Sequence, residues 1–122
     1  MDARALARLH ALGRLCVGAG LTLTPGFAAG GWVGGVVDKP EGQVLAIGLG
    51  GRDAAIAVGT LRALSAGYGA RRWVRAGMLA DAADLLATLK ARDRIPALAV
   101  PAVVAIAGAS VLLGAWLQAA VD

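Results

Sequence analysis

The sequence has little of what soluble enzymes commonly use for catalysis. It contains one cysteine, Cys16, and one histidine, His10. A lone cysteine cannot form an internal disulfide, and it has no partner for a cysteine metal motif. His10 is expected at a helix end rather than in a binding site, so no Ser/His/Asp catalytic set is expected around it. Neither a metal nor another cofactor is predicted from these residues.

Aromatic and charged residues are also scarce, at 4% and 16% of the chain. Soluble domains usually carry about 25% charged residues. The basic residues are not interleaved with aromatic side chains that would stack on bases, so no nucleic-acid partner is predicted. The low charge indicates instead a chain whose surface faces lipid.

Apolar and small residues are abundant. Hydrophobic residues make up 58% of the chain and glycine occurs 18 times, while the mean hydropathy is +0.70. Glycine and alanine let helices approach one another closely in lipid. A length of 122 residues is enough for one domain. We predict a single all-α domain, residues 1–122, built as a four-helix transmembrane bundle.

Four apolar segments define the predicted spans. Roughly 20 apolar residues are needed to cross the hydrocarbon core, and the last segment carries no charged residue. Short polar or glycine-rich breaks separate the segments, and the break from Gly30 to Gly35 is expected to be a flexible or re-entrant loop. The spans are predicted at about residues 5–24, 42–64, 71–91 and 95–121.

Basic residues flank these segments unequally. With the N-terminus inside, six lie on the cytoplasmic side and four on the far side. Because Lys and Arg favour cytoplasmic loops, this predicts a multi-pass protein of the inner cell membrane with both termini in the cytoplasm. The cytoplasmic set is Arg4, Arg8, Arg62, Arg71, Arg72 and Arg75, and the far set is Lys39, Lys90, Arg92 and Arg94.

Two other interpretations of the apolar segments fit the residues less well. The run 15–23 resembles the apolar part of a signal peptide, but two glycines interrupt it and the cleavage site that follows is poor. The run 44–50 resembles the strand and turn of a dinucleotide-binding unit. Asp53, however, stands where that fingerprint needs Gly or Ala. We therefore expect both segments to be spans.

Five charged residues fall near the middle of the first three spans. A charge at the bilayer centre costs roughly 3 kcal/mol or more when it is unpaired, so we expect them to pair inside the bundle. Two positive and three negative groups leave one excess carboxylate, which should hold a proton or bind a cation because desolvation disfavours the charged form. Helix neighbours point about 100° apart, so the adjacent Arg and Asp should reach different partners. These candidate site residues are Arg14, Arg52, Asp53, Asp81 and Asp84.

The second and third spans also share an internal similarity. Asp53-Ala-Ala leads to Thr60-Leu-Arg-Ala, and Asp81-Ala-Ala leads at the same offset to Thr88-Leu-Lys-Ala. Adjacent spans run in opposite directions, so a genuine repeat would be inverted, an arrangement that places sites at the midplane. Alanine-rich sequences also match by chance, and both interpretations stay open.

The Gly-Arg-Asp of residues 51–53 in the second span, the Asp-rich third span and the four short spans resemble a group of small four-span bacterial integral membrane proteins of unknown function. High Ala, Arg and Gly content suggests an actinobacterial source. The resemblance implies the membrane location and the fold, and it implies no activity.

Several roles for the five charges stay open. They form either a structural lock that specifies helix pairing or a site, since intramembrane ionisable residues often mark sites. Without His, Cys or Glu beside Asp81 and Asp84, a catalytic metal is not supported. A site would make the chain an accessory subunit or a protein that binds a proton or small ligand. The alternative is a membrane-embedded enzyme that uses an Asp as general acid on a lipid or isoprenoid-like substrate. The expected partners are the bilayer and either another membrane protein or a second copy.

Overall fold

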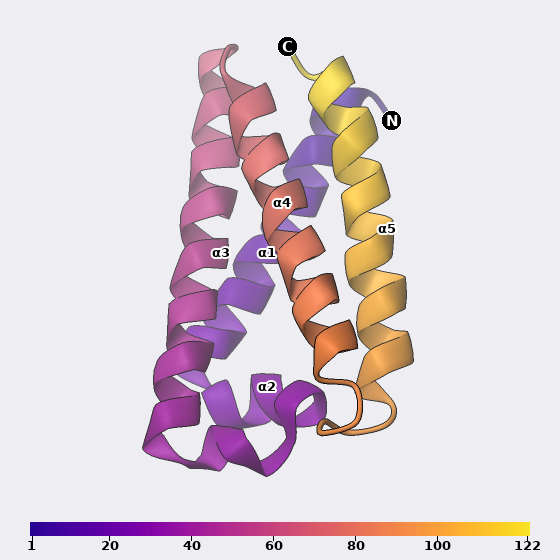
Figure 1. Ribbon diagram of the computed structural model, residues 1–122. Helices are drawn as coiled ribbons and strands as arrows, with labels where there is room; N and C mark the ends of the chain where they lie inside the picture. Colours follow the sequence, from indigo (N-terminus) through magenta and orange to yellow (C-terminus); the bar gives the residue numbers. More distant parts are fainter.

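The computed structural model describes residues 1–122, and all of its regular secondary structure is helical. Four long helices lie side by side, and a short helix with a 3₁₀ turn crosses beneath one end of them (Figure 1). Both chain termini lie at the opposite end. The prediction of an all-α fold is therefore confirmed. The elements are α1 (Ala3–Leu23), α2 (Pro25–Val33), the 3₁₀ helix η1 (Gly34–Asp38), α3 (Pro40–Ala66), α4 (Ala70–Lys90) and α5 (Ala99–Ala120).

Local sequence signals set most helix ends. The side chain of Asp2 caps α1 by accepting a hydrogen bond from the Ala5 N–H at 2.7 Å. Pro40 occupies the first turn of α3, where its missing N–H costs nothing. Gly67 ends α3 in the left-handed conformation, with φ of 88°, which a residue without Cβ adopts without strain. These signals are local, and the sequence predicted the helix ends beside them to within two residues.

Two sequence-based expectations for the connections are wrong. The segment from Gly30 to Gly35 is not a loop, because α2 and η1 continue through it as helix. The last helix begins at Ala99 rather than at residue 95. Pro101 lies in its first turn as expected, but Pro96 precedes the helix. Residues 91–98 form the turn that joins α4 to α5 instead.

The helices pack as two pairs, α1 with α3 and α4 with α5, joined mainly through α3 and α4. The α1–α3 crossing is a contact of backbone against backbone. A Cβ on Gly18 would lie 2.8 Å from the Gly50 oxygen, and a Cβ on Gly50 would lie 2.6 Å from the Gly18 oxygen. Only glycine at both positions permits this approach. Helices α1 and α5 contact each other sparsely.

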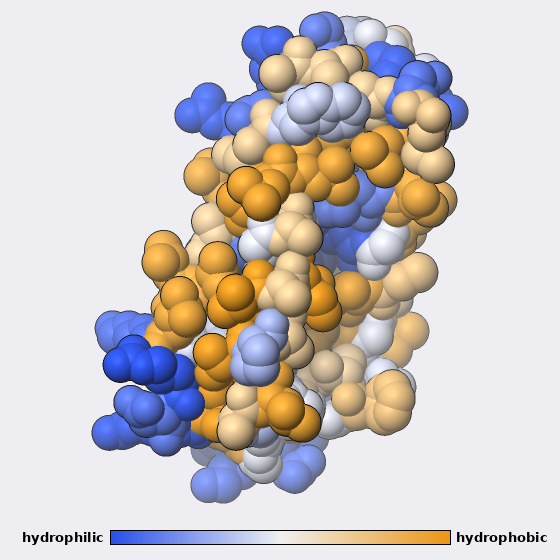
Figure 2. Space-filling view, turned by 90° about the vertical axis from the view of Figure 1, so that its right-hand side faces the viewer, coloured by the Kyte–Doolittle hydropathy of each residue, from blue (hydrophilic) through white to orange (hydrophobic).

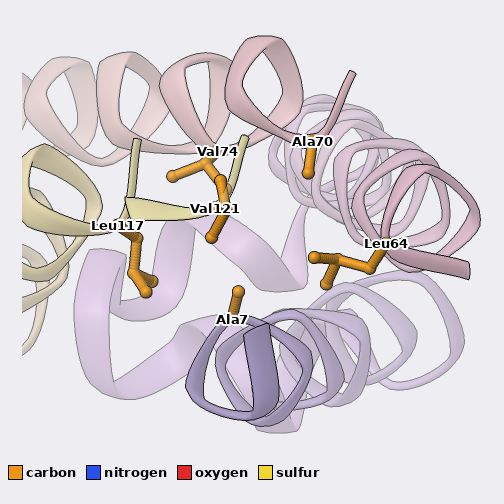
Figure 3. Packing of buried hydrophobic residues seen from close by; sticks show 6 residues of the cluster. All are labelled: Ala7, Leu64, Ala70, Val74, Leu117 and Val121. Atoms are coloured by element: carbon orange, nitrogen blue, oxygen red, sulfur yellow. The ribbon is translucent and has the colours of Figure 1, made fainter. Parts of the chain in front are cut away.

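The interior has an apolar core at each end of the bundle. The terminal core, at the end that carries both termini, gathers side chains from α1, α3, α4 and α5 that point toward one another (Figure 3). A smaller core lies under the opposite end, where α2 and η1 close the bundle. The terminal core consists of Ala7, Leu64, Ala70, Val74, Leu117 and Val121, and the other of Leu21, Ala29, Val37 and Ala46.

The distribution of apolar side chains is unlike that of a water-soluble bundle. Only three large side chains are fully buried, Leu64, Leu117 and Val37, whereas twenty large hydrophobic residues are exposed. Helices α3 and α5 are long and apolar enough to cross a membrane, and only 28% and 17% of their most apolar windows are buried. Figure 2 shows one face, on which mostly apolar residues lie between hydrophilic ends and surround a recessed hydrophilic patch at mid-height.

Candidate functional site

The five charged residues singled out in the sequence lie together at mid-height, between the two apolar cores. We call Arg14, Arg52, Asp53, Asp81 and Asp84 the charged cluster. They come from α1, α3 and α4, and four ion pairs join them into a chain. The prediction that they pair inside the bundle is confirmed.

Arg14 is the centre of the charged cluster. Its Nη1 donates to Asp53 Oδ1 at 3.1 Å, and its Nη2 donates to Asp81 Oδ2. Nη2 also donates to the Gly77 carbonyl at 3.3 Å. The Arg14 side chain is only 7% exposed. One buried guanidinium from α1 thus holds a carboxylate from α3 and another from α4.

Arg52 forms the other half of the charged cluster, nearer the surface. It binds Asp84 with two parallel bonds, Nη1 to Oδ1 at 2.9 Å and Nη2 to Oδ2 at 2.7 Å. Such a fork is the strong geometry for this pair. As expected, Arg52 and Asp53 reach different partners on other helices, Asp84 and Arg14. In addition, Arg52 Nε and Nη2 donate to Asp53 Oδ1, at 3.2 and 3.1 Å. The Arg52 side chain folds back along α3, so Asp53 receives both guanidinium groups.

The internal similarity has a structural counterpart. Its two leading aspartates, Asp53 and Asp81, accept from the two Nη atoms of the same Arg14. Its two threonines, Thr60 and Thr88, each donate to the carbonyl four residues earlier, at 2.8 and 2.7 Å. Because α3 and α4 run in opposite directions (Figure 1), equivalent residues approach Arg14 from two sides.

Two members of the polar network, Ser110 and His10, were not predicted from the sequence. The Ser110 hydroxyl donates to Asp81 Oδ2 at 2.5 Å, and its oxygen lies 2.8 Å from His10 Nε2. The interpretation of His10 as a helix-end residue is wrong, since it lies well inside α1. One signal was available: His10 precedes Arg14 by four residues and therefore shares its helix face. Ser110 is also the one polar side chain in the apolar run 95–117.

No Ser/His/Asp catalytic set was predicted around His10, yet a serine, a histidine and an aspartate do meet inside the bundle. Their order, however, differs from that of a catalytic triad. In a triad the imidazole lies between the serine and the carboxylate, whereas here Ser110 lies between His10 and Asp81. Asp81 consequently does not orient the imidazole, and this arrangement is a hydrogen-bonded path rather than an activated nucleophile.

The buried polar atoms of the network are all satisfied. No buried side-chain nitrogen or oxygen lacks a hydrogen-bond partner. At the end that α2 and η1 close, Trp32 Nε1 donates to Thr88 Oγ1 at 2.9 Å and ties α2 to α4. Neither of the two main surface grooves includes a residue of the charged cluster. The two main grooves therefore lie apart from the charged cluster.

The chain matches no protein-family model, no curated protein and no solved structure.

Proposed function

We propose that this chain is an integral membrane protein whose four long helices all cross the bilayer. The observation that carries the proposal is the inverted distribution of side chains. Twenty large apolar residues are exposed on the outside, whereas the interior holds mostly small residues, a few large apolar side chains at each end and the charged cluster. A soluble protein rarely exposes apolar patches of more than a few hundred Å², and a core helix of a soluble protein would bury its apolar windows.

Helices α1 and α4 are less apolar than α3 and α5, but their mid-height charges do not oppose insertion. Arg14, Asp81 and Asp84 are paired within the bundle, so lipid does not meet them as free ions. Of the remaining basic residues of these two helices, Arg4, Arg71, Arg72 and Lys90 lie near the helix ends, at headgroup depth. Arg8 and Arg75 lie about 9 Å from the cluster along their helices, and their long side chains extend toward the headgroups. The proposal extends to the predicted orientation, with both termini in the cytoplasm.

Alkaline carbonate extraction of membranes tests the location. The protein is expected to stay in the pellet, and its release into the supernatant would refute membrane integration. Reporters fused after Asp122 and within the α4–α5 turn test the orientation. A cytoplasmic signal from the first and a periplasmic signal from the second are expected. The reverse pattern would overturn the orientation, and two signals from one side would overturn the span count.

The activity that this geometry supports best is proton binding, with no enzymatic turnover. The charged cluster holds two guanidinium groups and three carboxylates, so it carries one net negative charge unless a proton is bound. In a low-dielectric site, one bound proton makes the network neutral. The proton has two places to reside: the Asp81 carboxyl group or the His10 imidazole, at the two ends of the Ser110 bridge.

The hydrogen bonds support exchange of the proton between these places. With His10 charged, Nε2–H donates to the Ser110 oxygen and the Ser110 hydroxyl donates to the Asp81 carboxylate. When the His10 proton moves to Ser110 Oγ, the Ser110 proton moves to Asp81 Oδ2. The product is a neutral imidazole that accepts from Ser110 and a protonated Asp81. His10 is only partly buried, so it is the end of the path that water can reach.

Proton counting tests this function. At neutral pH, purified wild-type protein is expected to hold one more proton than the Asp81→Asn variant, because the variant balances two guanidinium groups against two carboxylates. Infrared spectra of the carboxylic-acid stretch and nitrogen NMR of His10 locate the proton. Asp38→Asn, an exposed acid outside the network, is the matched control. Equal proton counts for wild type and Asp81→Asn would reduce the charged cluster to a structural lock.

The alternative, a membrane-embedded enzyme with an Asp as general acid, has less support. Such an enzyme needs a cavity that brings an apolar substrate to the acid. Neither main groove reaches Asp53, Asp81 or Asp84. The role as a proton-binding membrane protein requires no such cavity.

A further inference from the structure

A groove of about 540 Å³ runs between α3 and α4 toward the end that carries the termini. We call it the α3–α4 groove. Toward mid-height its lining is apolar, with Ala55, Val58 and Gly59, and the indole of Trp73 packs against Gly59. Its other end is lined by Arg62 and Arg72. The groove therefore has one apolar and one basic end, on the surface that the proposed membrane insertion turns toward lipid.

The shape of the groove depends on a glycine. A Cβ on Gly59 would lie 2.5 Å from ring atoms of Trp73, so only glycine lets the indole lie flat against α3. Trp73 is partly buried there, and its ring forms a rigid apolar wall. Tryptophan is typical of the depth at which acyl chains meet headgroups.

The two arginines are not neutralised within the protein. All four ion pairs of the structure lie inside the charged cluster, and none involves Arg62 or Arg72. A second groove, of about 670 Å³, shares Arg72 and adds Arg71 and Arg75. Its one acidic residue, Asp122, is engaged by the backbone N–H groups of Ala70 and Arg71. Arg62, Arg71, Arg72 and Arg75 thus face one carboxylate, and positive charge is in excess around the basic end of the α3–α4 groove.

The depth of these arginines suits a lipid phosphate. Arg62 follows Arg52 by ten residues on α3, which is about 15 Å of helix. Arg72 precedes Asp81 by nine residues on α4, a similar height. The hydrocarbon core is about 30 Å thick. With the charged cluster at the bilayer centre, both guanidinium groups reach the boundary where phosphates lie.

We infer that the α3–α4 groove binds one anionic phospholipid of the surrounding bilayer. Arg62 and Arg72 hold the phosphate, since guanidinium groups match its geometry with forked hydrogen bonds. An acyl chain lies along Val58, Gly59 and Trp73 toward mid-height. This inference rests on the proposed membrane insertion, but it does not depend on proton binding by the charged cluster.

Native mass spectrometry of the detergent-purified protein tests the inference with phosphatidylglycerol and phosphatidylcholine as probes. Wild type is expected to retain one phosphatidylglycerol in preference to phosphatidylcholine. Each basic residue near anionic headgroups contributes about fivefold, so Arg62→Gln/Arg72→Gln should weaken phosphatidylglycerol binding roughly 25-fold. Arg92→Gln/Arg94→Gln, at the other end of the bundle, is the matched control and should bind as wild type does.

Fluorescence quenching tests the position of the acyl chain. In a Trp32→Phe/Trp116→Phe background, only Trp73 remains. Phosphatidylglycerol with brominated acyl chains should quench Trp73 in this protein, and should quench it far less when Arg62 and Arg72 are both Gln.

Equal phosphatidylglycerol binding by wild type and the Arg62/Arg72 double variant would overturn the inference. Complete displacement of phosphatidylglycerol by glycerol phosphate, which has no acyl chain, would also overturn the inference. The groove would then bind only the phosphate and not the acyl chain. Failure of the membrane proposal is separately visible, since carbonate would release the protein. A protein that stays in the pellet but shows no lipid preference refutes the groove site alone.

Discussion

The terminal core and the charged cluster hold the same helices at two heights by different physics. In the terminal core, Leu64 and Leu117 are fully buried among small apolar neighbours (Figure 3). At mid-height, contact between α1 and α4 depends on the long side chain of Arg14, which reaches Asp81 and the Gly77 carbonyl. Apolar packing is non-directional and fixes distance, whereas forked ion pairs also fix register. This bundle therefore obtains compactness and specificity from separate layers.

Removing the centre of the charged cluster should have the largest effect. Arg14→Leu strands Asp53 and Asp81 without their shared counter-charge, and breaking a buried pair in this way costs about 3–5 kcal/mol. Protonation of the stranded carboxyl groups would lower the loss. Thermal unfolding in detergent measures it. Arg8→Leu, at an exposed position on the same helix, is the control and should change stability little. A similar result for both variants would mean that the charged cluster does not hold the bundle.

Truncation in the terminal core should come next. Leu117 is fully buried, and replacing a buried Leu by Ala costs about 2–5 kcal/mol. Leu112→Ala lies on the same helix at 74% exposure and should cost much less. Chemical denaturation in mixed micelles compares the two variants. If Leu112→Ala lowers the free energy of unfolding as much as Leu117→Ala does, exposed leucines contribute as much to stability as leucines of the terminal core.

A substitution at the α1–α3 crossing should lower the stability of the bundle by a smaller amount. Gly50→Ala places a methyl group against the Gly18 carbonyl and Thr22 N, at 2.6 and 2.8 Å before relaxation. Overpacking of this kind costs about 1–3 kcal/mol. Gly51→Ala meets no atom within 4 Å and should be neutral or stabilising, because alanine favours helix by up to about 1 kcal/mol. If Gly50→Ala and Gly51→Ala shift the unfolding midpoint in the same direction, the close crossing at Gly50 is refuted.

The smallest expected effect is the coupling between Arg52 and one carboxylate. A double-mutant cycle with Arg52→Leu and Asp84→Asn should give an interaction energy of about 0.5–3 kcal/mol, because the two side chains form a fork. The same cycle with Asp81→Asn should come closer to additivity, since Asp81 binds Arg14 instead. Unfolding of each single and double variant measures both cycles. Coupling to Asp81 that exceeds coupling to Asp84 would contradict the pairing.

Much of the architecture was predictable because it depends on local chemistry. Helices are predicted by apolar runs of span length, and their ends by Pro40 in a first turn and Gly67 after a last turn. These signals act within one helix and do not depend on its neighbours. The membership of the charged cluster was equally accessible. Unpaired charges are costly at the centre of an apolar bundle, so Arg14, Arg52, Asp53, Asp81 and Asp84 had to find one another.

What only the tertiary structure decided is which groups meet. The rotation and crossing of the helices pair Asp84 with Arg52, and they pair both Asp53 and Asp81 with Arg14. They also placed Ser110 between Asp81 and His10, a contact across 100 residues of sequence from His10. Periodicity fixes the face on which a residue lies on its own helix. It carries no information on how far that helix turns toward its neighbours, and glycine crossings such as Gly18 with Gly50 set that angle.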